Sequence, residues 1–173
     1  MTQPYSGALS ISRAFLWILR VFNLFMGVCL VVAFVASFPF EAQFFEFFSK
    51  RPPRIDPSWL VPALRLWMVL ALPMIAAVHI LLSRLLEMVE TVRTGDPFVP
   101  ENATRLKTIA WCALVNELLR LAYGVMAATL NAAGSNIDWK FDAYGWLGVV
   151  LVFVLARVFE EGTRMRQDLE SMI

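Results

Sequence analysis

The sequence contains few charged residues, and the charges almost cancel. Charged residues make up 17% of the 173 residues, against about 25% in a typical soluble domain. Lysine and arginine number 15 and aspartate and glutamate 14, which gives a formal net charge of +1. Because the chain has no large excess of basic residues, we expect no direct binding to nucleic acid.

Cysteine and histidine are also scarce, and the common catalytic motifs are missing. Cys29 and Cys112 lie in separate apolar segments, with no CxxC spacing and no neighbouring histidine, so they are predicted to be small core residues. No HExxH, GxSxG or Walker sequence and no carboxylate pair with metal-ligand spacing is present. We therefore expect no enzyme activity, no cofactor and no metal site.

Hydrophobic residues, in contrast, make up 59% of the chain and gather in four long runs. These runs are residues 15–38, 59–82, 109–130 and 143–159. A helix needs about 20 residues to cross the hydrocarbon core of a bilayer. The sequence therefore predicts an all-α protein with one integral membrane domain, residues 1–173, folded as a four-transmembrane-helix bundle. The first run is too long for the apolar part of a signal peptide and is predicted to stay as an anchor.

The basic residues between the predicted spans are divided unequally between the two sides. One side carries Arg13, Arg20, Arg84, Arg93, Arg105, Lys107, Arg157, Arg164 and Arg166, and the other carries Lys50, Arg51, Arg54, Arg65 and Lys140. Short loops rich in lysine and arginine stay in the cytoplasm. Both termini are therefore predicted to be cytoplasmic.

The loop between the first two spans has aromatic residues at helical spacing. Phe40, Phe44, Phe47 and Phe48 fall near one helical face, and Pro52, Pro53 and Pro57 follow. This pattern predicts an interfacial helix on the outer surface of the membrane that the prolines end. We interpret it as a lid against lipid, with a docking patch for a partner as the alternative.

Two helices are predicted to continue past the membrane on the cytoplasmic side. Leu85, Val89 and Val92 extend the apolar stripe of the second span, and Met165, Leu169 and Met172 do so for the fourth. Charged residues occupy the other faces of both segments. Such amphipathic extensions of helices 2 and 4 are able to pack against each other.

Residues 94–102, TGDPFVPEN, connect the second and third spans, and we call them the elbow. Gly95 is able to take the positive φ that ends a helix, and Pro97 keeps Asp96 out of the helical region. Pro100 suits the first turn of the next helix. The elbow is therefore predicted to be a non-helical connection between two helices on the cytoplasmic side.

Phe98 is the large apolar residue of the elbow, and two interpretations remain open for it. In the first, the elbow is a stiff connection in which Phe98 packs against the neighbouring helical extension. In the second, the elbow is a recognition loop for a cytoplasmic partner.

Two segments, residues 95–111 (GDPFVPENATRLKTIAW) and 152–170 (VFVLARVFEEGTRMRQDLE), resemble the bacterial membrane family catalogued as domain of unknown function 2975. The resemblance rests on Gly95, Asp96, Pro97, Phe98, Asn102, Arg105, Phe159 and Gly162. It implies a four-span protein of the bacterial cytoplasmic (inner) membrane, without an established activity. Relatives in that family are often encoded beside small helix-turn-helix regulators, which suggests such a regulator as a partner.

Several polar residues fall inside the predicted spans, where polar groups are costly. They are Arg20, Asn23, His79, Asn116, Glu117 and Arg120. Counted from the cytoplasmic ends of their spans, Asn23 and Glu117 are expected at a similar depth. One interpretation is a buried network that fixes helix rotation and register. The other is a water-filled cavity in which Glu117, Arg120 and His79 bind a ligand or relay protons.

The leading hypothesis is a non-enzymatic sensor or regulatory protein that binds a cytoplasmic partner through the elbow and the helical extensions. The alternatives are a small-solute or proton transporter or channel, and an accessory subunit of a larger membrane complex. The predicted spans are expected to contact membrane lipid. Small residues around Gly124 form a seam for close packing, either within the bundle or in a homo-oligomer.

Overall fold

The computed structural model describes residues 5–43, 46, 57–93, 95, 97–132 and 137–170. Its four long helices are α1 (Tyr5–Ala36), α3 (Pro57–Arg93), α4 (Pro100–Ala132) and α5 (Ala143–Glu170). Each contains a segment that is long and apolar enough to cross a membrane. The predicted all-α fold with four membrane spans is thereby confirmed.

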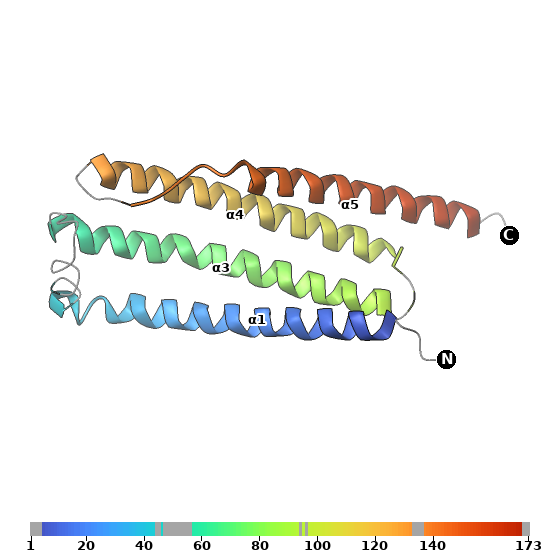
Figure 1. Ribbon diagram of the computed structural model, residues 1–173, viewed down its shortest axis with the longest axis horizontal. Helices are drawn as coiled ribbons and strands as arrows, with labels where there is room; N and C mark the ends of the chain where they lie inside the picture. The colour runs from blue at the N-terminus through green and yellow to red at the C-terminus, as the bar shows by residue number, and fades with distance from the viewer. Residues whose placement is uncertain are drawn as a thin grey trace.

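The helices pack in the order of the chain, each antiparallel to the one before it (Figure 1). α3 packs against α1 and α4, and α4 packs against α5. Among the described residues, no other pair of helices brings Cα atoms within 8 Å. The bundle is therefore open, with α1 and α5 at its two edges.

Polar contacts at both ends fix the register of α1 on α3. Arg65 donates hydrogen bonds to the Oγ and the carbonyl oxygen of Ser37, at 3.2 and 2.7 Å. At the opposite end, Arg13 pairs with Glu90 at 3.7 Å. Between Arg65 and Arg84, α3 has no charged residue over residues 66–83, about 27 Å of helix. This length matches the hydrocarbon thickness of a bilayer, about 30 Å.

The buried core lies toward the elbow end of the bundle, where α3, α4 and α5 meet. Leu106, Ile109 and Ala156 form its centre, and Leu81, Leu85, Met88, Val152 and Phe159 pack against it. α1 takes no part in this core, and large apolar side chains such as Trp17 and Phe22 are 60% exposed on it. In a membrane these side chains face lipid.

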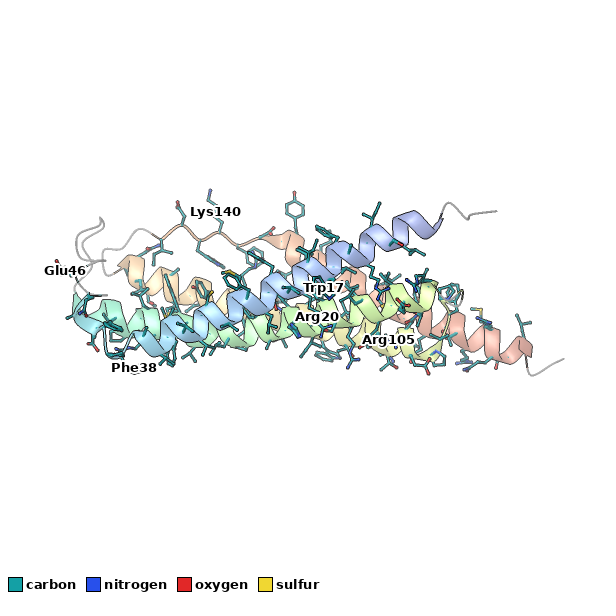
Figure 2. All side chains as sticks on the ribbon, turned by 90° about the horizontal axis from the view of Figure 1, so that it is seen from below. Trp17, Arg20, Phe38, Glu46, Arg105 and Lys140 are labelled. Carbon is teal, nitrogen blue, oxygen red and sulfur yellow. The ribbon has the colours of Figure 1, made fainter. Side chains whose placement is uncertain are left out.

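The connection from α4 to α5 doubles back along α4 before the last helix begins (Figure 1). The side chain of Asn131 bonds both backbone groups of Ile137, donating to its carbonyl oxygen at 2.9 Å and accepting from its N–H at 2.7 Å. The indole of Trp139 then occupies the space that a Cβ on Gly124 would need. Figure 2 shows Lys140, from the same segment, pointing away from the helices. The small residue at position 124 therefore admits Trp139, which the sequence did not indicate.

Part of the predicted interfacial helix cannot be compared with the structure, whereas the two predicted helical extensions can. Phe44, Phe47, Phe48, Pro52 and Pro53 of the predicted interfacial helix lie outside the described residues, as do Lys50, Arg51, Arg54 and Met172. α3 continues as one helix to Arg93 and α5 to Glu170. The continuation of these helices is observed, whereas their position beyond the membrane stays a prediction.

Candidate functional site

The elbow separates two helices where the sequence predicts, since α3 ends at Arg93 and α4 begins at Pro100. Gly95 has a φ of 97°, in the left-handed region that glycine tolerates, and its N–H donates to the carbonyl oxygen of Val92 at 3.2 Å. α4 begins at Pro100, as expected for a proline in a first helical turn. Asp96, a predicted elbow residue, lies outside the described residues.

Asn102 holds the elbow together from the first turn of α4. The residue is fully buried, and its Nδ2 donates to the Oγ1 of Thr91 at 2.8 Å and to the carbonyl oxygen of Pro97 at 2.9 Å. Its Oδ1 accepts a hydrogen bond from Nη1 of Arg105 at 2.9 Å. One side chain therefore connects the end of α3, the elbow backbone and α4.

Arg105 also connects α4 to α3 through a carboxylate. Its Nε donates to Oε2 of Glu87 at 3.0 Å, and Arg84 donates to the same oxygen at 2.9 Å. These three side chains line one wall of a surface recess of about 360 Å³ beside the start of α4. Glu87 pairs with both guanidinium groups, so its carboxylate compensates one of their two positive charges.

Phe98 packs on α5. Its ring stacks on that of Phe159, with centroids 5.3 Å apart and an angle of 27° between the planes. The same ring lies over Gly162, where an added Cβ would come within 3.4 Å of it. Phe98 nevertheless remains 44% exposed. The elbow is therefore docked on α5 and still presents an aromatic surface.

The end of α5 projects beyond the elbow (Figure 1). Met165 is 57% exposed and Leu169 is 63% exposed. They follow Gly162 by three and seven residues, so they lie on the helical face that carries Phe98. Phe98, Met165 and Leu169 are three exposed apolar side chains at this end of the bundle, and we call them the apolar row.

A second cluster of polar side chains, separate from that around Asn102 and Glu87, lies at the start of α5. Arg120 bonds Oε2 of Glu117 through its Nε at 3.0 Å and donates to the carbonyl oxygen of Asp142 at 2.8 Å. The Asp142 carboxylate accepts the N–H of Tyr144 at 2.9 Å, so Asp142 is the N-cap of α5. The carboxylate of Glu117 occupies the space beside Gly145 where a Cβ would stand. This group therefore fixes where α5 begins.

The remaining predicted intramembrane residues lie elsewhere. Asn23 and His79 line a groove between α1 and α3. Asn116 donates to the carbonyl oxygen of Cys112 within α4, at 3.0 Å. Arg20 lies on α1, one turn from Asn23 (Figure 2). Four of the six residues thus lie at two different helix interfaces, with Glu117 and Arg120 facing α5 and Asn23 and His79 between α1 and α3.

Sequence reasoning missed four residues that organise these sites: Thr91, Glu87, Asp142 and Gly145. Asp142 carried a usable signal, because an aspartate directly before an apolar run is a common N-cap. The others gain their roles from partners on another helix. In the part of the chain that the structure describes, no three His, Cys, Asp or Glu side chains gather in a way that could hold a metal ion.

Comparison with family models gives one match. The model described as protein of unknown function, DUF2975, matches residues 11–173, almost the whole chain. This range contains the elbow, both polar groups and the apolar row. Searches of curated proteins and of solved structures gave no match.

Proposed function

We propose that this chain, which belongs to the DUF2975 family of proteins of unknown function, is a non-enzymatic regulatory protein of the bacterial cytoplasmic membrane. It binds a cytoplasmic protein through the elbow and the projecting end of α5. The observation that carries the proposal is the apolar row. Met165 and Leu169 are exposed on the end of α5, which extends past its neighbours, and Phe98 is exposed on the elbow that packs against α5.

The apolar row has the geometry of a protein-binding surface. Residues 163–170 extend α5 by about 12 Å beyond Gly162. Arg164, Arg166 and Asp168 surround the row with charge, so an apolar strip has a polar rim, as binding patches do. Because Phe98 is held by its stacking on Phe159, little side-chain freedom is lost when a partner binds.

The distribution of charge supports a cytoplasmic position for this end. Arg84, Arg93, Arg105 and Lys107 lie near the elbow, and Arg157 and Arg164 lie on the adjacent part of α5. Short flanks rich in arginine and lysine remain on the cytoplasmic side of bacterial membranes. The elbow and both termini are therefore placed in the cytoplasm in this proposal.

The proposed partner is a small helix-turn-helix regulator of the kind that the family resemblance suggests. An amphipathic helix of that regulator would lie along the apolar row, with its own apolar residues at helical spacing. Membrane capture would then control how much of the regulator is free to bind DNA. The chain itself would not touch nucleic acid.

A two-hybrid assay between the full chain and such a regulator tests the proposal. Introducing charge with the double variant Met165→Glu and Leu169→Glu should reduce the interaction at least tenfold. Gln167→Glu is the control for added negative charge, because it places one such charge at an exposed position on another face of the same helix end. The proposal fails if the double variant binds as well as the control while both reach the membrane at equal levels.

The transport alternative requires a continuous polar path across the membrane. The described intramembrane polar residues lie at two different helix interfaces, and no observation favours transport over partner binding. An accessory role in a larger complex is compatible with the apolar row, because it also requires a protein partner.

A further inference from the structure

The surface recess beside the start of α4 has the size and the chemistry of a binding site. Its volume of about 360 Å³ is within the usual range of small-molecule sites, roughly 300 to 1,000 Å³. Its lining comes from two helices and consists of Arg84, Glu87, Pro100, Glu101, Thr104, Arg105 and Thr108. Two arginines and two glutamates give the recess no net charge, although it presents both signs.

The two arginines of the recess have donors to spare. Both bond the same oxygen of Glu87, so their guanidinium groups lie side by side. Among the described residues, Arg84 bonds only through Nη1, and Arg105 only through Nε and Nη1. A guanidinium group has five N–H donors, so Nη2 of each arginine is able to bind an anionic oxygen. The side chain of Arg84 is 44% exposed, which leaves it accessible to a ligand.

The other end of the recess presents hydrogen-bond acceptors. Glu101 is exposed, and within the part of the chain that the structure describes its carboxylate has no hydrogen bond or ion pair. Thr104, one turn along α4, donates its hydroxyl proton to the carbonyl oxygen of Pro100 at 3.3 Å. Its Oγ1 therefore remains as an acceptor. A carboxylate with a hydroxyl oxygen beside it suits an ammonium group, which has three donors and no acceptor.

The recess lies at the boundary of the hydrocarbon. Arg84 is the first charged residue of α3 after the uncharged residues 66–83. The helices α3 and α4 are antiparallel (Figure 1), and Glu87 of one pairs with Arg105 of the other. Thr108 therefore lies level with Arg84, at the membrane end of the recess.

The order of groups along the recess matches that of a zwitterionic phospholipid. Ile80 on α3 and Val115 on α4 are exposed apolar residues on the membrane side of Arg84 and Thr108. Glu101 lies on the opposite side, about 10.5 Å from Thr108 along α4. From the hydrocarbon outward, the protein thus presents apolar surface, guanidinium groups and a carboxylate. Phosphatidylethanolamine presents acyl chains, a phosphate and a primary ammonium in the same order.

We propose that the recess binds the phosphoethanolamine headgroup of phosphatidylethanolamine. The phosphate accepts hydrogen bonds from Arg84 and Arg105, and the ammonium donates to the carboxylate of Glu101 and to Oγ1 of Thr104. A choline headgroup has no N–H to donate, and a glycerol headgroup has no positive charge for Glu101. Both should therefore bind less well. This site is independent of partner binding at the apolar row.

Native mass spectrometry of the purified full chain in detergent tests the proposal, with dioleoyl phosphatidylethanolamine, phosphatidylcholine and phosphatidylglycerol as the probes. Phosphatidylethanolamine should bind at least tenfold more tightly than either of the others, because it alone satisfies both ends of the recess. Equal binding of phosphatidylcholine would show a site for phosphate alone, and stronger binding of phosphatidylglycerol would show a site for anionic lipid. Displacement of the lipid by an equal concentration of soluble glycerophosphoethanolamine would show a site for a water-soluble ligand. Each of these three results overturns the proposal.

Variants separate binding at the recess from lipid adhesion elsewhere. Glu101→Gln should weaken binding of phosphatidylethanolamine about tenfold and leave that of phosphatidylcholine unchanged, so that the preference is lost. Glu161→Gln is the matched control, because it removes one carboxylate from a position outside the recess at the same end of the bundle. Arg84→Gln should weaken binding of all three lipids, because each carries the phosphate. The same preference for phosphatidylethanolamine in Glu101→Gln and Glu161→Gln, at equal helical content, would refute the assignment.

Discussion

Replacing Asn102 by alanine should loosen the elbow more than any other single amide substitution in α4. The side chain is fully buried and makes three hydrogen bonds of 2.8 to 2.9 Å, to Thr91, Pro97 and Arg105. A neutral bond contributes about 0.5–1.5 kcal/mol and a bond to a charged group about 1.5–3. Arg105 keeps its bond to Glu87, so we take the low end of these ranges. The expected loss is about 2.5 kcal/mol.

Asn131→Ala is the control for this prediction. Asn131 also bonds a backbone segment twice, at Ile137, but it is exposed. Water replaces lost bonds at an exposed position, so its loss should stay below about 1 kcal/mol. Equilibrium unfolding in mixed micelles, followed by circular dichroism, measures both free energies.

Hydrogen exchange gives a local measure of the same change. Asn102→Ala should speed amide exchange at Phe98, Val99 and Glu101 more than in the middle of α4, because the elbow loses its anchor to α3. If Asn102→Ala and Asn131→Ala destabilise the chain equally, the elbow is not organised by the Asn102 side chain, and the reasoning is refuted.

Two further predictions concern glycines. Gly145→Ala should destabilise the chain by about 1–3 kcal/mol, because the new Cβ enters the space of the Glu117 carboxylate; in a Glu117→Ala background, which lacks that carboxylate, the same glycine substitution should cost much less. Gly148→Ala, which meets open space on the same helix, should instead be neutral or stabilising by up to about 1 kcal/mol, and equal effects at the two glycines in micelle unfolding would contradict the packing. Gly95→Ala should cost about 1–2 kcal/mol, because its φ of 97° is unfavourable for a residue with a Cβ, and a loss below about 0.3 kcal/mol in the same assay would rule out the positive φ.

The apolar row and the groove between α1 and α3 lie in different parts of the bundle. Met165 and Leu169 belong to the projecting end of α5, whereas Asn23 and His79 lie between α1 and α3.

The sequence alone determined the number and order of the spans, the break at the elbow and the family. These features are local, since hydropathy over about 20 residues predicts a span and a glycine followed by prolines predicts a helix end. The starts of α4 at Pro100 and of α5 at Ala143 agree with the sequence, because the residue types there act within a single turn.

Only the tertiary structure decided which polar residues meet. Asn23 and Glu117 were considered as members of one polar network, yet Asn23 shares a groove with His79 while Glu117 packs beside Gly145. The difference arises because depth and facing depend on register between helices, which contacts such as Arg65 with Ser37 fix across 28 residues of chain. The burial of Asn102 and the packing of Trp139 on Gly124 have the same origin, since each requires a partner that no local pattern specifies.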